Sequence, residues 1–266
     1  MKIISSPSNP AIKFMRSLRL KKEREAAGQF YVEGIRLVGE AVRTRQEIEY
    51  VVVCPEILDS SFAKELLVEI EKLGIETISV PEAIFETLSI KEGPQGIAAV
   101  VKEKWHALDE ISANQGLWVA LDSVQDPGNL GSILRSLDAA GGKGVVLLDE
   151  ATDPYHPTSV RASMGGIFSQ KIIKSTLAEF SNWKKASGYS LIGTICGDGI
   201  NYRGYNYPED MILLMGSEQK GLTPAHEGIC DALVTIPMKG SVDSLNLANA
   251  ASIVIFEILA QMQDNS

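Results

Sequence analysis

Residues 116–135 read GLWVALDSVQDPGNLGSILR: an apolar run, a Pro-Gly turn and then the first turns of a helix. The apolar run at residues 117–121 does not alternate polar with apolar side chains, which is typical of a strand buried on both faces of a parallel sheet. Pro127-Gly128 predicts the turn, and Asn129 is placed to cap the helix. A strand, a turn and a helix in this order indicate an α/β fold.

Four further apolar runs of this kind follow, with predicted helices between them. Because none of them alternates, we expect their strands to form one parallel sheet with helices on both faces. The runs cover residues 144–148, 190–195, 211–215 and 233–237, and the helices about 130–140, 159–168, 177–186 and 245–262.

The first hundred residues have a different pattern, with short strand-like runs set among amphipathic segments. The runs lie at residues 50–54, 75–80 and 97–101, and the helices at about 9–24, 34–45 and 61–73. A charged and polar segment comes next. We therefore expect a first domain at residues 1–103, a linker at 104–115 and a second domain at 116–266.

The composition is that of an ordinary globular protein, with 45% hydrophobic and 22% charged residues among 266. Three scattered cysteines and three histidines have no metal-ligand spacing, so we expect free thiols in a reducing compartment and no bound metal. We expect no signal peptide, and no apolar run reaches ~18 residues. We expect a soluble, cytoplasmic protein without a membrane partner.

Basic residues gather near the N-terminus of a chain whose net charge is −9. Residues 1–30 hold seven basic and two acidic residues, a net charge of +5. Such a segment is either a phosphate-binding surface or a solvated helix face, and charge alone does not decide between them. The basic residues that we expect to contact nucleic acid phosphates are Arg16, Arg19, Lys21, Lys22 and Arg24.

Three glycine-containing segments each follow a predicted strand. In the first, Arg135 comes four residues after Gly131 and so projects near the same helix face. A cation near the carboxyl ends of the strands, where open α/β sheets bind ligands, suits a phosphate. In the second, GSEQKGL at residues 216–222, Gly216 offers bare backbone to a flat ligand and Glu218 offers a carboxylate at its edge.

The third segment has IPM at residues 236–238 and SLN at 244–246. Ser244 is placed to cap the last helix, whose first turn is small and polar. Elsewhere, the glycine-rich run at residues 141–144 precedes a strand, whereas a dinucleotide-binding fingerprint follows one. Ser163 lacks the Gly-x-Ser-x-Gly turn of a hydrolase nucleophile. These patterns exclude a Rossmann dehydrogenase and a serine hydrolase.

Together and in this order, the three segments resemble the SpoU-type (TrmH-like) branch of the SPOUT RNA methyltransferases. They match its motifs Pro-Gly-Asn-x-Gly…Arg, Gly-x-Glu-x-x-Gly and Ile-Pro-Met…Ser-Leu-Asn. The run VRASMG at residues 160–165 is similar to the family pattern, and the first hundred residues are similar to its N-terminal substrate-binding domain. One departure is Ala248, where the family commonly has serine.

The resemblance implies a C-terminal α/β domain with a mainly parallel sheet and a deep trefoil knot, preceded by a small L30e-like α/β RNA-binding domain. It implies a homodimer that moves the methyl group of S-adenosylmethionine to a ribose 2′-hydroxyl, in 23S rRNA more than in tRNA. The cofactor would lie at Thr194, Gly216, Ile236 and Leu245, and Arg161 would join the RNA-binding residues. The catalytic residues would be Arg135, Asn129, Glu218, Ser244 and Asn246.

Methyl transfer chemistry fits these residue types. A sulfonium makes its methyl group electrophilic, so no metal is required, but the ribose hydroxyl has to lose its proton. Arg135 is either a perturbed base or a protonated cation that binds phosphate and stabilises the developing alkoxide. Three alternatives remain: a tRNA 2′-O-methyltransferase, a non-catalytic RNA-binding or assembly protein on this fold, and an adenylate-binding or acyl-transfer α/β protein.

Overall fold

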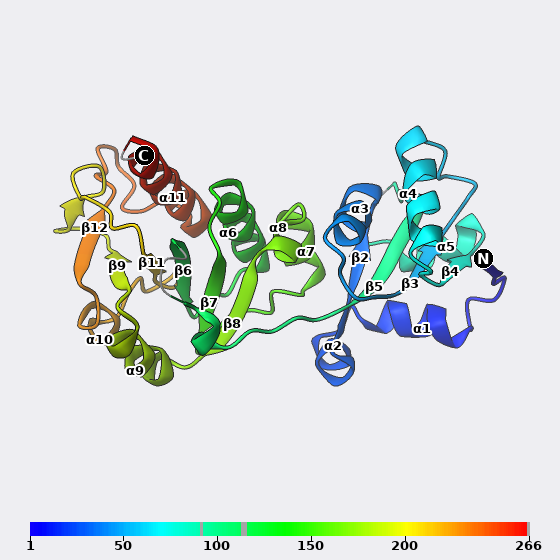
Figure 1. Ribbon diagram of the computed structural model, residues 1–266, viewed down its shortest axis with the longest axis horizontal. Coiled ribbons are helices and arrows are strands. Elements are labelled where there is room, and N and C mark those ends of the chain that lie inside the picture. The colour runs from blue at the N-terminus through cyan, green and yellow to red at the C-terminus, as the bar shows by residue number, and fades with distance from the viewer. Residues whose placement is uncertain (91–92, 113–115, 265–266) are drawn as a thin grey trace. The chain divides into compact units, whose positions relative to one another are not determined.

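The computed structural model describes residues 1–90, 93–112 and 116–264, and the chain divides into two compact units (Figure 1). The first unit holds residues 1–103 and 155–168, and the second unit holds the rest. The segment 155–168 therefore clusters with the first unit, although we expected it within the second domain. Its Tyr155 and Phe168 rings lie 4.6 and 6.3 Å from the ring of Phe30, centroid to centroid. The predicted linker 104–115 ends in residues 113–115, which lie outside the described residues.

The first unit contains a mixed sheet of five strands in the order β1-β4-β3-β5-β2. The strands β1, β4 and β3 are parallel, while β5 runs antiparallel to both β3 and β2. The three predicted strands are confirmed, and the two that the sequence pattern missed are at the sheet's edges. The bounds are β1 (Lys2–Ile3), β2 (Gln29–Glu33), β3 (Ile48–Val53), β4 (Thr77–Ser79) and β5 (Ile97–Lys102).

The helix predicted at residues 9–24 is wrong as a single element, because the structure has two helices there, α1 (Pro10–Ser17) and α2 (Lys21–Ala27). Leu20 between them is extended, and the buried Arg24 side chain donates from Nη1 to the Leu18 carbonyl at 2.8 Å. This hydrogen bond satisfies a carbonyl that the broken helix leaves free. The unit's other helices are α3 (Ile35–Arg43), α4 (Ser61–Lys72), α5 (Glu82–Leu88), α7 (Pro157–Ala162) and α8 (Gly166–Ser169).

The second unit contains a sheet of seven strands, all parallel, in the order β10-β12-β9-β11-β6-β7-β8. The predicted parallel sheet is thus confirmed. Its central strand is β11, and β6 lies directly beside it. The bounds are β6 (Leu117–Asp122), β7 (Gly144–Leu148), β8 (Lys171–Ser175), β9 (Ser190–Thr194), β10 (Ile200–Asn201), β11 (Met211–Met215) and β12 (Ala232–Thr235).

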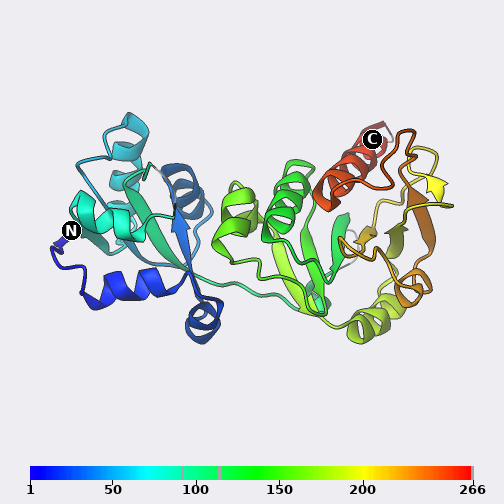
Figure 2. The ribbon, with the colours of Figure 1, turned by 180° about the vertical axis from the view of Figure 1, so that it is seen from behind.

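Helices cover this sheet on both faces, as the non-alternating strands predicted. One face of β6 presents Trp118 and Ala120 to a buried core that includes Phe180 of α9 (Leu177–Ser187). On the other side α6 (Pro127–Ala139) packs against α11 (Leu247–Asp264), and Ser136 Oγ lies 2.8 Å from Ser252 Oγ. Figure 2 shows α6 and α11 side by side from behind. A short helix α10 (Pro224–Glu227) and the 3₁₀ turn η1 (Leu108–Glu110) complete the unit.

Two expectations from composition concern the whole chain. Cys54, Cys196 and Cys230 are free thiols, as predicted. Within the described ranges, no helix is long and apolar enough to cross a lipid bilayer. The trefoil knot stays a prediction.

Candidate functional site

A hydrogen-bonded row of side chains joins the three glycine-containing segments of the sequence. Asn129, at the start of α6, donates from Nδ2 to Glu218 Oε1 at 3.0 Å. Asn246, just before α11, donates from Nδ2 to Asn129 Oδ1 at 2.9 Å. We call Glu218, Asn129 and Asn246 the polar chain. The segments lie far apart in the sequence, and the parallel sheet brings them together at the carboxyl ends of β6 and β11.

The loop after β6 holds the Glu218 carboxylate from its other side. The backbone N–H of Gln125 donates to Oε2 at 3.1 Å, and that of Asp126 donates to Oε1 at 3.2 Å. Partial burial by itself would raise the pKa of Glu218, but the bonds from Asn129 and these two amides outweigh it and lower that pKa. Glu218 is therefore a fixed anion at neutral pH. Backbone donors carry no sequence signature, so the sequence could not identify them.

The helix caps differ from those expected, and the difference frees Asn129 for the polar chain. Asp126, not Asn129, caps α6, since its side chain accepts from Asn129 N–H at 2.8 Å. Asn246, not Ser244, caps α11 by accepting from the N–H groups of Ala248 and Asn249. Ser244 is exposed and makes no hydrogen bond within the described chain. Among the predicted catalytic residues, Ser244 is thus outside the polar chain.

Arg135 lies in the middle of α6, on its exposed side. Its guanidinium has no hydrogen bond or ion pair with any residue that the structure describes. The neighbouring positions Leu134 and Leu137 are buried in the core and fix the orientation of the helix. A cation held in this way, without a carboxylate partner of its own, is available to an anionic ligand.

Three of the four predicted cofactor-binding residues lie at the ends of adjacent strands. Thr194 ends β9, while Gly216 and Ile236 directly follow β11 and β12. Because β12, β9 and β11 are neighbours and parallel, these positions share one edge of the sheet. Thr194 Oγ1 donates to the Leu214 carbonyl at 3.3 Å. Leu245, on the loop after β12, is 36% exposed.

Gly216 has a different local role from the one expected. A Cβ atom there would lie 2.0 Å from the Gly221 carbonyl carbon, so the chain's own backbone fills the space that we assigned to a flat ligand. By contrast, no backbone N–H or C=O of residues 237–245 forms a hydrogen bond within the described part of the chain. This loop therefore offers free backbone donors and acceptors to a ligand.

The predicted RNA-binding residues all belong to the first unit, and they differ in exposure. The prediction is wrong for Arg24, which is fully buried. Arg19 is half-buried, and its Nη2 donates to the carbonyls of Thr87, Leu88 and Ser89 at the end of α5. The side chains of Lys21, Lys22 and Arg161 are exposed, and Arg16, which is half-buried, donates to the Pro7 carbonyl.

Comparison with known proteins identifies the family to which this chain belongs. A model of the SpoU rRNA Methylase family matches residues 116–256, more than half of the chain. The chain belongs to the SpoU rRNA methylase family. A second model, the MRM3-like substrate binding domain, matches residues 9–99. The SpoU match contains all three segments that meet in the polar chain.

Relatives of this SpoU methylase align over almost their whole lengths. The 23S rRNA (uridine(2479)-2′-O)-methyltransferase of Streptomyces viridochromogenes is 33% identical over 91% of this chain and 86% of its own. The 23S rRNA (guanosine(2553)-2′-O)-methyltransferase RlmP of Bacillus subtilis is 32% identical over 97% and 99%. The crystal structure of an AdoMet-bound rRNA methyltransferase from Sinorhizobium meliloti is similar with a TM-score of 0.89, at 33% identity and 98% coverage of both chains. The family and the relatives agree with the resemblance drawn from the motifs.

Proposed function

We propose that this SpoU methylase transfers the methyl group of S-adenosylmethionine to a ribose 2′-hydroxyl of 23S rRNA. The observation that carries the proposal is the polar chain, which joins all three family motifs into one hydrogen-bonded unit. The named 23S rRNA relatives, which align over both units, support rRNA over tRNA. These two relatives modify different nucleotides, a uridine and a guanosine, so identity at this level does not select the nucleotide.

The cofactor's place in this proposal is the edge formed by Thr194, Gly216, Ile236 and Leu245. S-adenosylmethionine supplies an electrophilic methyl group there. The free backbone of residues 237–245 suits the polar parts of the nucleoside and methionine, and the side chains of Ile236 and Leu245 suit a flat base. Gly216 contributes by letting the backbone at Gly221 pass close to β11, which keeps Glu218 next to this edge.

Arg135 acts in this proposal as a cation. A guanidinium stays protonated in proteins, so it binds the RNA phosphate and stabilises the negative charge that develops on the 2′-oxygen. Asn129 and Asn246 orient the ribose, and the fixed Glu218 anion holds Asn129 in place. Ser244, which is exposed beside them, would contact the RNA directly.

We also propose a division of labour along the chain: residues 1–103 bind RNA, 104–115 link, and 116–266 carry out the transfer. The exposed Lys21, Lys22 and Arg161 would neutralise phosphates. The family resemblance implies a homodimer, and two exposed apolar side chains on α11, Ile253 at 37% and Phe256 at 47%, support α11 as part of its interface. Light scattering of the purified protein measures the oligomeric state.

The test is transfer of labelled methyl from S-adenosylmethionine into separated 23S rRNA and tRNA from a strain that lacks this protein. We expect label in 23S rRNA, in dinucleotides that resist alkali because their 2′-oxygen is methylated. Label in tRNA alone would replace the proposal with a tRNA methyltransferase. Cofactor binding without label in either RNA would indicate a non-catalytic RNA-binding protein on this fold.

A further inference from the structure

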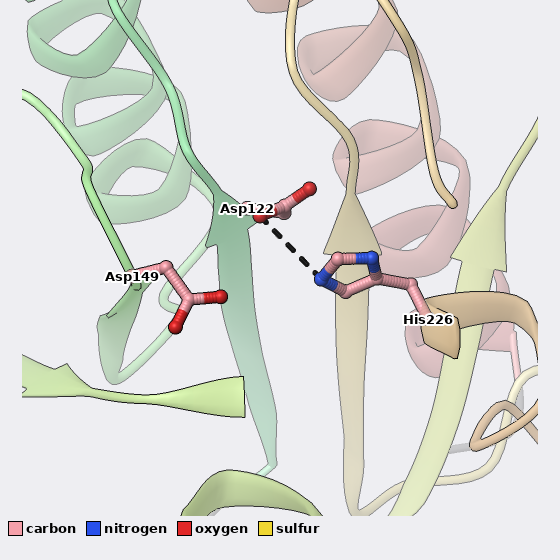
Figure 3. A group of neighbouring side chains, drawn as sticks. All are labelled: Asp122, Asp149 and His226. Carbon is pink, nitrogen blue, oxygen red and sulfur yellow. Dashed lines mark ion pairs between the residues drawn. The ribbon is translucent and has the colours of Figure 1, made fainter. Parts of the chain in front are cut away.

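A second group of polar side chains lies at the same edge of the seven-stranded sheet, outside the polar chain. Asp122 is the last residue of β6, Asp149 follows β7, and His226 is on α10. Figure 3 shows the three side chains pointing toward one another. One ligand atom of each lies within 4.8 Å of those of the other two. We call these residues the Asp122 cluster.

His226 is buried, and one of its ring nitrogens has no hydrogen bond within the described part of the chain. The side chain is buried, with a residue exposure of 4%. Its Nδ1 lies 2.7 Å from Thr223 Oγ1, which fixes the plane of the ring. Its Nε2 faces Asp122 Oδ1 at 3.4 Å, yet it forms no hydrogen bond with any described residue. Buried ring nitrogens are rarely left without a partner.

The spacing of these atoms suits two ligands of one cation. Ligands at about 2.1 Å from a metal ion, with bond angles between octahedral and tetrahedral, are separated by roughly 3.0–3.4 Å. The distance between His226 Nε2 and Asp122 Oδ1 falls at the upper end of this range. The Thr223 hydroxyl stands where outer-shell partners of metal-bound histidines stand, on the other ring nitrogen.

The negative charges of the two carboxylates in the cluster also favour a bound cation. Asp122 is 5% exposed, and a buried carboxylate is costly unless a positive charge or several hydrogen bonds compensate it. Its Oδ1 accepts from Ser123 Oγ at 2.9 Å. Asp149 adds a second carboxylate, whose Oδ1 accepts from Leu177 N–H at 3.2 Å. Neither carboxylate pairs with a lysine or an arginine among the residues that the structure describes.

We propose that Asp122, Asp149 and His226 bind a divalent first-row metal ion, Zn²⁺ or Mn²⁺. Two carboxylate oxygens and one imidazole nitrogen are a donor set that both ions accept, with water in the remaining positions. The expectation that the protein binds no metal rested on sequence spacing. The ligands come from three separate segments, so spacing could not reveal them.

The ion's role in this proposal is to position the loop after β6. It would connect the ends of β6 and β7 to α10. Residues 123–126 directly follow Asp122, so the ion would fix the start of this loop. The N–H groups of Gln125 and Asp126 in that loop hold Glu218. Gln125 Nε2 also donates to the Glu150 carbonyl, next to Asp149. The ion touches no reacting atom, and its binding is measurable whether or not the protein transfers methyl groups.

The experiment uses the full chain, stripped with a chelator and titrated calorimetrically with ZnCl₂ or MnCl₂. We expect one equivalent to bind. At about 100 times the dissociation constant, the ion should raise the melting temperature by on the order of 5–10 °C. Absence of stoichiometric binding of either ion to the wild-type chain would overturn the proposal.

The decisive variant is Asp149→Asn. Asp149 is exposed and has a φ of 52°, a conformation that asparagine also adopts readily, and an amide oxygen still accepts from Leu177 N–H. We expect the metal-free melting temperature to stay unchanged and the metal affinity to fall by more than about 100-fold. Glu150→Gln removes the adjacent exposed carboxylate, which is outside the cluster, and should leave the affinity unchanged.

The competing explanation is a plain ion pair between a protonated His226 and Asp122, without a metal. That pair does not need Asp149. Equal metal affinity in Asp149→Asn and the wild type would therefore refute the site. His226→Gln distinguishes further, because the cation site predicts loss of the metal-induced stabilisation, whereas a plain ion pair predicts a loss of stability that is the same with and without metal.

Discussion

The polar chain and the Asp122 cluster lie at the same edge of one sheet, and they satisfy their polar atoms in opposite ways. Glu218 accepts hydrogen bonds from Gln125, Asp126 and Asn129, so its carboxylate is fully engaged by the protein. The Asp122 cluster is largely buried, yet His226 Nε2 has no hydrogen bond among the described residues. A fully hydrogen-bonded carboxylate such as Glu218 can orient its neighbours. A buried ring nitrogen without a hydrogen bond, such as His226 Nε2, is available to a ligand.

Arg135→Ala should have the largest effect on methyl transfer. Removing a cation that stabilises the developing oxyanion costs about 10²–10³-fold in rate. Cofactor affinity should stay nearly unchanged, because Arg135 is on α6 and not at the edge of β9, β11 and β12. Single-turnover transfer and calorimetric titration with S-adenosylmethionine measure the two quantities. Loss of cofactor binding in this variant would contradict the assignment of Arg135.

Glu218→Gln should weaken transfer by roughly 10–100-fold, since hydrogen bonds to a charged group contribute about 1.5–3 kcal/mol. The amide keeps the size of the side chain but replaces one acceptor oxygen with a donor, which conflicts with the N–H groups that face it. A variant with full transfer activity would show that the polar chain does not orient the substrate.

Asn246→Ala should lower stability moderately. The change removes the cap of α11 and the bond to Asn129, and loss of an N-cap costs about 1 kcal/mol. For a chain of this size, that corresponds to a fall in melting temperature of roughly 2–4 °C. Ser244→Ala is the matched control, because Ser244 caps nothing, and its melting temperature should equal that of the wild type.

Acid should weaken both the contribution of Glu218 to stability and metal binding at the Asp122 cluster. Both changes should be small near neutral pH. The lowered pKa of Glu218 means that its contribution to stability is fully present above the unfolded value of about 4.3 and is lost as pH falls through the lower folded value. Protons also compete with a metal ion for its ligands, so metal affinity should fall on acidification. Melting curves with and without Zn²⁺ between neutral and acid pH measure both effects. A metal-induced stabilisation that does not fall in acid would contradict the proposed ligands.

Strands formed by unbroken apolar runs were predictable from the sequence. Strands and helices whose residue pattern is interrupted were not. β6, β7 and β11 are unbroken apolar runs, and they agree with the predicted ranges. β8 was missed because Lys171 and Lys174 interrupt its apolar residues. The helix expected at 159–168 is broken at Met164 and Gly165, both of which have positive φ. The adjacent Gly165-Gly166 pair is a turn signal that the predicted helix did not take into account.

The candidate site was predictable to the extent that its residues stand in motifs. Asn129, Glu218 and Asn246 were assigned together from three short segments, and the structure joins them directly. The burial of Arg24 was not predictable, because a basic residue on an amphipathic helix is usually exposed. The Asp122 cluster needs the register of β6 against β7 and the placement of α10, and both are tertiary facts.

The pairing of Asn246 with Asn129 has a consequence for the order in which the protein becomes functional during synthesis. A ribosome makes the chain from its N-terminus, so β6 and the start of α6 emerge well before residue 246. Until the last helix leaves the exit tunnel, Asn129 lacks its partner and the loop at 237–245 is incomplete. A nascent chain that has not yet exposed residue 246 therefore cannot form the polar chain.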